Sequence, residues 1–101
     1  MTFASSVLSA CRPRFQAGRL TMTSRVMALV QRGQLNVLSY LARHLNGDWG
    51  DVSQEDWQAN QRALRDHQCL RSSYVLSPDL KFCLITESDR SMTQALLSDE
   101  S

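Results

Sequence analysis

The chain has 101 residues, of which 43% are hydrophobic and 21% are charged, so it suits one small globular domain and excludes wholesale disorder. Eleven basic residues against ten acidic ones give a formal net charge of +1, far from the strongly basic balance of domains that bind nucleic acid by charge alone. No apolar run approaches the roughly 18 residues that span a bilayer, so no membrane partner is expected.

Charge is distributed unevenly along the chain. Residues 1–47 hold six arginines and no acidic residue, whereas residues 48–101 hold all ten acidic residues and five basic ones. Arginine favours planar partners such as phosphate and carboxylate, so a nucleic-acid surface built from Arg19, Arg25, Arg32 and Arg43 is one interpretation. The favoured interpretation is that the basic half packs across the acidic half of the same domain.

The first 17 residues have the weakest pattern in the sequence. Small and weakly apolar residues precede Arg12 and Arg14, which reverses the order of a secretory signal. We expect a flexible N-terminal extension over residues 1–17; an organelle transit peptide and a start codon assigned too early are the alternatives. The folded domain is expected to span residues 18–98, with residues 99–101 as a C-terminal tail.

Cysteine usage indicates a reducing compartment. Cys11, Cys69 and Cys83 are an odd number without a C-x-x-C pair, which favours the cytoplasm over a secreted disulfide scaffold. Cys69 and Cys83 lie in apolar runs and are expected to be free core thiols. Since His44 and His67 are the only histidines, neither a structural zinc nor another cofactor is expected.

The first elements are a short strand and two helices. Loose alternation predicts a short edge strand near residues 20–22, and Thr23 or Ser24 can cap a short helix that ends near Gly33. A broad apolar stripe predicts a firm helix over residues 34–45. Asn46-Gly47 then supplies the left-handed conformation that ends a helix.

A third helix is predicted from the N-cap Ser53 to about His67. Glu55 and Asp56 fall in its first turn, where the helix dipole favours negative charge. Val52 and Trp57 have the spacing of a hydrophobic staple around that cap.

Strand patterns dominate from Cys69 onward. Apolar runs at 70–76 and 82–86 flank the turn sequence Ser77-Pro78-Asp79 and predict a β-hairpin. Residues 92–97 fit a third strand or a short helix; the strand is favoured because a two-stranded hairpin is marginal alone. The expected fold is α+β, with two or three helices packed on a small antiparallel meander of three strands, to which the short edge strand would add a fourth.

The segment from Gly47 to Asp51 is the most unusual in composition. An exposed Trp49 between glycines would be an interface anchor, and Asp48 and Asp51 are too few for a calcium loop. The favoured alternative folds Trp49 back over the helix junction while both aspartates cap backbone amides.

Nothing in the sequence indicates catalysis. Glu87, Asp89 and Arg90 follow a strand, where two acids and an arginine fit acid–base chemistry or, as is favoured, a polar turn with a local ion pair. There is no Gly-rich phosphate loop and no H-E-x-x-H or G-x-S-x-G pattern. We therefore expect a protein that is not an enzyme.

Two segments carry a family resemblance. RHLNGDWGD at residues 43–51 and ITESDRS at residues 85–91 resemble a family of short bacterial proteins encoded on plasmids and integrative elements, often labelled plasmid-related and sometimes labelled a type I restriction-modification subunit. The resemblance covers residues 15–98. It departs at Cys83, where the family has an aromatic residue, and at Gln94-Ala95, where the family's last strand is rich in Thr. It implies a mobile-element origin and no activity.

Two functions remain as expectations. The first is a small, cytoplasmic, non-catalytic interaction protein of a bacterial mobile element that binds a host or mobile-element protein, with inhibition of restriction or CRISPR interference as a candidate role. Its interaction residues would be Asp48, Trp49, Asp51, Glu55, Asp56, Glu87, Asp89 and Arg90. The second is a small nucleic-acid-binding accessory module that uses Arg19, Arg25, Arg32 and Arg43.

Overall fold

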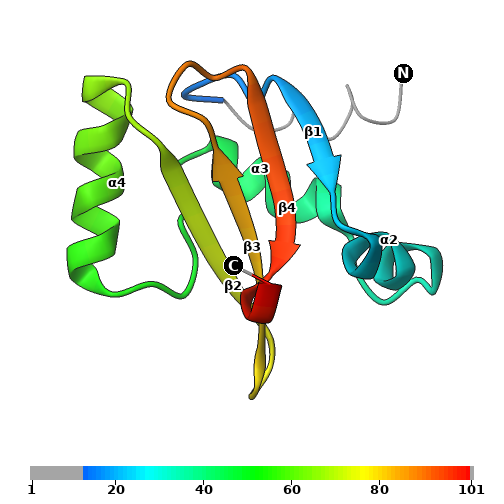
Figure 1. Cartoon of the computed structure of the whole chain (residues 1–101). Coiled ribbons are helices and arrows are strands. Elements are labelled where there is room, and N and C mark those ends of the chain that lie inside the picture. The colour runs from blue at the N-terminus through cyan, green and yellow to red at the C-terminus, as the bar shows by residue number, and fades with distance from the viewer. Residues whose placement is uncertain (1–12, 101) are drawn as a thin grey trace.

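The computed structural model describes residues 13–100, and their architecture is α+β, as predicted (Figure 1). In chain order the elements are β1 (Arg19–Met22), α2 (Ser24–Gln31), α3 (Val37–Leu45), α4 (Gln54–Asp66), β2 (Leu70–Ser77), β3 (Leu80–Thr86), β4 (Met92–Leu97) and the short 3-10 turn η1 (Ser98–Glu100). No helix within these described residues is long and apolar enough to cross a bilayer.

The four strands form one mixed sheet in the order β1-β4-β3-β2. The antiparallel meander β2-β3-β4 is confirmed, and residues 92–97 are a strand rather than a helix. Thr93, Ala95 and Leu97 of β4 are buried on one side of the sheet and Leu96 is buried on the other, in the alternation between two sides that a strand requires. The short strand β1 is also confirmed, but it pairs in parallel with β4, so the sheet is mixed rather than purely antiparallel.

Helix boundaries follow the capping residues. Thr23 accepts a hydrogen bond from the Val26 N–H at 3.3 Å and begins α2, and Gly33 follows its end with φ of 71°. The predicted helix over 34–45 begins later, at Val37, because the side chain of Asn36 accepts from the Ser39 N–H at 3.2 Å and caps the helix there.

The third helix, α4, has the predicted ends. Ser53 caps it by accepting from the Asp56 N–H at 3.1 Å, and His67 closes it in the left-handed conformation with φ of 56°. Val52 and Trp57 pack against the same small cluster, as a hydrophobic staple requires.

The helices leave one face of the sheet uncovered. Helix α3 lies behind the sheet, α4 lies beside the β2 edge and α2 lies beyond the end of β1, so no helix crosses the front of the sheet in Figure 1. The main core lies between the sheet and α3; its buried members include Val26, Leu35, Val37, Leu41, Leu45, Tyr74, Phe82, Leu84, Ala95 and Leu97. We call the uncovered side the open sheet face.

Residues that were expected to be terminal extensions pack against the domain. The Arg14 N–H donates to the Leu45 carbonyl at 2.8 Å, and the ring of Phe15 stacks on Trp49 with centroids 6.1 Å apart. The remainder of the expected extension, residues 1–12, lies outside the described residues. The packed unit therefore includes residues before Gly18.

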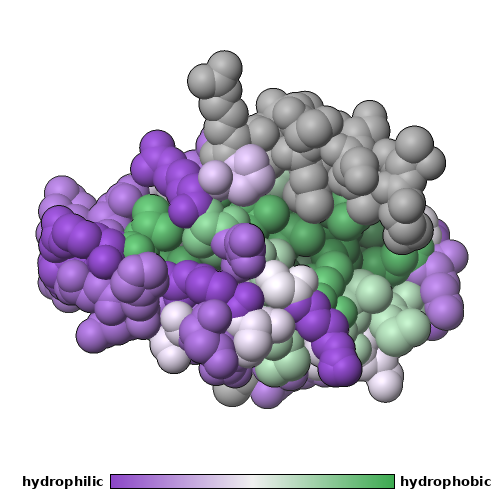
Figure 2. Space-filling view, turned by 90° about the horizontal axis from the view of Figure 1, so that it is seen from above, coloured by the Kyte–Doolittle hydropathy of each residue, from purple (hydrophilic) through white to green (hydrophobic). Residues whose placement is uncertain are grey.

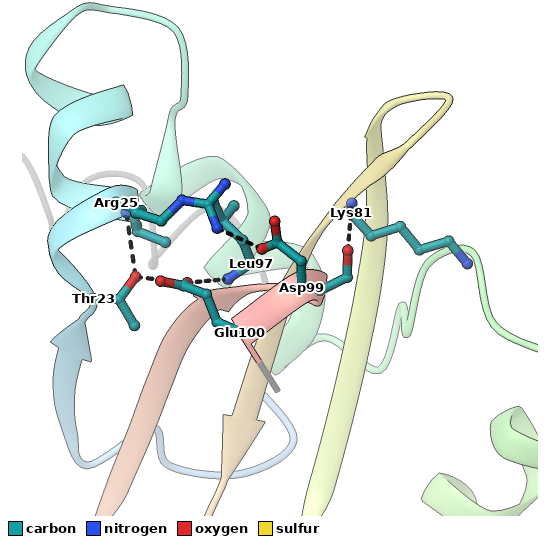
Figure 3. Close-up of polar contacts among 8 residues, drawn as sticks. Thr23, Arg25, Lys81, Leu97, Asp99 and Glu100 are labelled. Atoms are coloured by element: carbon teal, nitrogen blue, oxygen red, sulfur yellow. Dashed lines mark hydrogen bonds and ion pairs between the residues drawn. The ribbon is translucent and has the colours of Figure 1, made fainter.

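The turn η1 is also packed (Figure 3). The Asp99 carboxylate accepts from Arg25 at 2.7 Å, and the Glu100 carboxylate accepts from the Thr23 hydroxyl at 3.0 Å and from the Leu97 N–H at 2.8 Å. Residues 99 and 100, expected to be tail, thus hold the last strand against the start of α2.

Candidate functional site

The segment Trp49–Asp51 closes the outer edge of β2. The Asp51 N–H donates to the Ser73 carbonyl at 2.6 Å, and the Ser73 N–H donates to the Trp49 carbonyl at 3.1 Å. The Asp51 carboxylate then accepts from the Val75 N–H at 2.9 Å. Together these bonds satisfy the backbone groups that an edge strand otherwise presents to other chains.

Trp49 is not an exposed interface anchor; that possibility is wrong. Its side chain is fully buried, at 0% relative exposure, because the chain reverses at Gly50 and carries the indole into a small cluster with Ala63 of α4 and Leu70 of β2, against the ring of His44. Gly50 has φ of 80°, and a Cβ there would lie 2.2 Å from the Ser73 carbonyl oxygen, so only glycine allows this approach. The favoured alternative, Trp49 folded back over the helix junction, is what the structure contains.

Asp48 is also engaged by the fold. Its carboxylate accepts from Arg43 at 2.8 Å and from the Gly50 N–H at 3.1 Å. The Tyr74 hydroxyl donates to the Asp48 carbonyl at 2.6 Å, and the Arg43 guanidinium lies 4.6 Å from the Tyr74 ring centroid. This ion pair raises the pKa of Arg43, mainly through its hydrogen bond to Asp48.

Glu87, Asp89 and Arg90 form a structural turn. The Arg90 guanidinium donates to the Gln68 carbonyl at 2.6 Å and to the Ala63 carbonyl at 3.2 Å, so it caps the C-terminal end of α4. The Asp89 carboxylate accepts from the Ser91 N–H at 3.0 Å, and hydrogen bonding from the Ser91 side chain, then from its backbone, lowers the pKa of Asp89. The favoured prediction of a polar turn therefore fits the geometry, but Arg90 bonds backbone carbonyls rather than a local acid.

The acidic residues Glu55 and Asp56 are exposed in the first turn of α4. Asp56 borders a cavity of about 420 Å³ between α4 and β2, together with Val52, Ala59, Asn60, Arg71 and Ser73. The Asn60 carboxamide bonds both backbone groups of Arg71: its NH₂ donates to the carbonyl at 2.7 Å and its oxygen accepts from the N–H at 3.1 Å. Asn60 thereby continues the edge closure that Asp51 begins.

A buried polar chain that sequence reasoning missed connects β2, α3, β3 and β4. His44, at 0% exposure, bonds the Ser72 hydroxyl through Nδ1 and the Thr86 hydroxyl through Nε2, the latter at 2.8 Å. Thr86 and Thr93 share a bond of 2.7 Å, and Thr93 donates to the Ala17 carbonyl at 2.7 Å.

The direction of each bond in this chain follows from counting protons. Because the single hydroxyl proton of Thr93 goes to a carbonyl, Thr93 accepts from Thr86, and Thr86 must then accept from Nε2–H of His44. Nδ1 is left to accept from Ser72. Burial, with a smaller contribution from the positive charge of Arg90, lowers the pKa of His44 to about 3, so the ring is neutral at physiological pH and shielded from substrates.

The four arginines proposed as a nucleic-acid surface do not act alike: two form ion pairs and two are exposed. Arg25 and Arg43 are held in ion pairs with Asp99 and Asp48, at 2.7 and 2.8 Å. Arg19, at the start of β1, and Arg32, after α2, are exposed. Half of the set is therefore already neutralised by carboxylates.

The cysteines differ from each other. Cys83 is buried, as expected, although the register places it on the open sheet face and not in the main core. The expectation that Cys69 is a core thiol is wrong: it is exposed, because it stands in the connection after α4 rather than inside β2. Within residues 13–100, no group of three or more His, Cys, Asp and Glu side chains could hold a metal ion.

An apolar groove lies beside β1, and the sequence did not indicate it. Its volume is about 410 Å³, and it is lined by Leu20 and Met22 of β1, Val30 of α2, and Gly33, Leu35, Asn36, Val37 and Leu38 around the start of α3. We call it the β1 groove. Figure 2 shows hydrophobic residues gathered on the side away from α4, while hydrophilic residues gather at the α4 end. Val30 on its rim is 37% exposed.

The open sheet face has a different character. By strand alternation from the pairing register, its charged residues are Arg19, Arg71 and Lys81. Among the described strand residues it carries no acidic and no aromatic side chain, because Tyr74 and Phe82 point to the helix-covered side.

No family model, curated protein or solved structure matches the chain.

Proposed function

We propose that the protein is a small non-catalytic interaction protein that binds a protein partner through the β1 groove. The observation that carries this proposal is the groove itself, an apolar depression bordered by a half-exposed valine. Exposed apolar patches with polar surroundings mark interaction sites in soluble proteins. This moves the expected contact surface from the acidic half of the chain to its basic half.

The acidic residues support this shift. Asp48, Asp51 and Asp89 each accept hydrogen bonds from the fold, so a partner that bound them would compete with intramolecular contacts. Glu55, Asp56 and Glu87 are the exposed remainder, and they lie on α4 and on the turn after β3 rather than beside an apolar centre. Binding surfaces draw most of their affinity from buried apolar anchors.

Catalysis is poorly supported by the same geometry. Among residues 13–100, the one hydrogen bond between a histidine and a serine hydroxyl is that of His44 with Ser72, and both side chains are fully buried. A base with a pKa of about 3 is also far from the range that suits general-base chemistry at neutral pH.

Nucleic-acid binding is the second candidate, because one observation favours it. The described strand residues of the open sheet face include three cations and no acid, as an anion-binding surface would. Sheets that bind single strands, however, stack bases on aromatic side chains, and this face has none among the described residues. Protein binding remains the better supported function.

The family resemblance adds the biological setting of the proposal. A short protein of a bacterial plasmid or integrative element that binds a protein partner fits an inhibitor of a host defence such as restriction or CRISPR interference. Under this proposal the target is a protein of such a system.

The proposal is tested with two matched valine variants. Val30 borders the β1 groove and Val75 is exposed on β2, at 37% and 48%, so Val30→Glu and Val75→Glu add the same charge inside and outside the site. We expect host proteins captured by the tagged wild-type protein to be lost with V30E and retained with V75E, while both variants keep their fold by circular dichroism.

A salt titration with labelled duplex DNA separates the two candidates. The protein-binding proposal expects weak DNA binding that V30E leaves unchanged. Tight DNA binding that weakens steeply between about 50 and about 200 mM salt, together with partner capture that survives V30E, would replace it with the nucleic-acid module.

A further inference from the structure

We infer that the partner of the β1 groove is an extended peptide segment that adds to the free edge of β1 as a fifth strand, with apolar side chains in the groove and an acidic side chain opposite Arg19. This inference rests on the proposed function and names the chemistry of its partner. It is argued from the backbone of β1, the lining of the groove and the charges around it.

The backbone of β1 offers a template for another strand. The Arg19 N–H donates to Ser91 and the Thr23 N–H donates to Ala95, at 3.0 and 3.1 Å. Because backbone groups alternate along a strand, the N–H and C=O groups of Leu20 and Met22 point away from β4. Within the described residues β1 is the terminal strand on this side, and such an edge is where extended peptides add.

The two edges of the sheet differ in a way that singles out β1. On the β2 edge, Asn60 bonds both backbone groups of Arg71, and Asp51 and Trp49 bond those of Ser73. No comparable bonds from residues 13–100 cover the outer groups of Leu20 and Met22. One edge is therefore closed by dedicated side chains while the other is left available.

The groove fixes which side chains the peptide presents. Leu20 and Met22 place their side chains in the groove and their outward backbone groups at the edge beside it. A strand paired there alternates its own side chains between the groove and the open sheet face. Every second residue of the peptide must therefore be apolar, to fill a lining made by Val30, Leu35 and Leu38.

Charge sets the identity of the alternate residues. Arg19 is exposed on the open sheet face at the start of β1, and Arg32 is exposed next to Gly33 of the groove. The nearby carboxylates of Asp99 and Glu100 lie past the other end of β1 and are engaged by Arg25 and Thr23. An acidic side chain opposite Arg19 makes the favourable cross-strand pair, whereas a basic one there meets like charge.

A second copy of this chain fits the edge poorly. Antiparallel pairing of two β1 strands through the outward backbone groups of Leu20 and Met22 sets Leu20 opposite Met22 and Arg19 opposite Thr23, which supplies no carboxylate. The acidic-apolar pattern must therefore come from another protein.

The first test is a selection from a displayed library of random peptides of about ten residues, the upper range of strand lengths, on the full-length protein. We expect enriched peptides to alternate apolar with acidic or polar residues. Enrichment of basic peptides, of peptides without alternation, or of none above background overturns the inference.

The second test separates the backbone contact from the side-chain contact. Met22→Ala and Met22→Pro both remove the side chain, but only M22P removes the outward N–H, and neither removes a bond to β4. For an enriched peptide, M22P should weaken binding about tenfold more than M22A, which corresponds to one lost hydrogen bond. Equal affinities of the two variants, with matched melting temperatures, contradict strand addition.

Hydrogen exchange of the Leu20 and Met22 amides shows whether the added peptide, this chain itself or a second copy covers the outer edge of β1. Fast exchange in the free protein and protection with the peptide support the inference. Protection in the free monomer, or protection that grows with protein concentration alongside dimer in sedimentation, means that this chain covers its own edge and overturns it. Loss of partner capture by V30E without any strand-forming peptide would leave the proposed function standing while this inference fails.

Discussion

Stability should fall as the solution is acidified from about pH 7.5 to about pH 5, because His44 is buried as a neutral ring. Burial lowers the pKa of His44 from 6.5 to about 3 in the folded chain. A group with a depressed folded pKa stabilises the fold fully above its unfolded pKa, and this contribution is lost as the pH falls from 6.5 toward 3. At about pH 5 the unfolded chain binds a proton at His44 that the folded chain does not bind. This difference lowers the free energy of unfolding by about 2 kcal/mol.

Urea unfolding at the two pH values measures this loss. Trp49 is fully buried, so its fluorescence reports unfolding, and the comparison ends near pH 5 so that most carboxylates, including Asp89 with its lowered pKa, stay ionised. The control is His44→Gln, which keeps a donor and an acceptor but cannot titrate. Its stability should differ by less than about 0.5 kcal/mol between the two conditions.

A direct titration supports the same prediction when H44Q is too unstable to measure. The carbon-bound ring protons of His44, followed by NMR, should keep the chemical shift of a neutral imidazole down to about pH 4. An inflection near pH 6.5 in the folded protein, or equal unfolding free energies of the wild type at both pH values, would refute the neutral buried ring and with it the proton directions assigned to the chain.

The remaining predictions concern how the sheet edge and the helix end are closed. Gly50→Ala should destabilise the protein by more than about 2 kcal/mol, because its Cβ meets the Ser73 carbonyl at 2.2 Å, whereas Gly33→Ala, with a similar φ and nothing within 4 Å, should cost about 1 kcal/mol. Asn60→Leu should cost about 2 kcal/mol through two lost hydrogen bonds, and Asn60→Asp should recover part of this, since one oxygen still accepts. Arg90→Met should cost about 2 kcal/mol by releasing the end of α4.

Each of these predictions is checked by urea unfolding against the wild type. Equal losses for G50A and G33A would mean that backbone conformation, rather than the close approach at Gly50, sets the cost. Equal losses of unfolding free energy for N60L and N60D would contradict the two hydrogen bonds between Asn60 and the backbone of Arg71. A neutral R90M variant would show that the end of α4 needs no side-chain cap.

The local pattern of the sequence predicted most of the elements. Ser53, Gly33 and Asn46-Gly47 mark helix ends through interactions with their own neighbours, so they can be read without the rest of the fold. The late start of α3 was not predicted, because the apolar stripe already includes residues 34 and 35. In the structure the helix begins after them, where the side chain of Asn36 caps it.

The features that needed tertiary structure could not be predicted. The parallel pairing of β1 with β4 joins segments about 70 residues apart, and no local pattern encodes it. His44 stands in a helix with nothing beside it to mark a partner, and Ser72, Thr86 and Thr93 meet it only once the sheet has formed. The β1 groove likewise takes its lining from three separate elements.

The distinctive residues of the sequence are largely structural. Gly50, Asp51 and Arg90 belong to the segments that drew most of the expected interaction residues, yet they close a strand edge and a helix end. Unusual residue types are expected wherever the backbone needs a special conformation or an orphan group needs a partner. In a small domain such residues can mark how it folds rather than what it binds.

The position of β4 also determines when the domain can form during synthesis. Among residues 13–100, β4 is the last strand and yet lies between β1 and β3, and Glu100 bonds Thr23 across 77 residues. A nascent chain that has not yet released residues 92–100 from the ribosome lacks the strand that joins both sides of its sheet. Folding of this sheet must therefore wait until residues 92–100 have been released, and long-range pairing of this kind makes it slower than folding from local contacts.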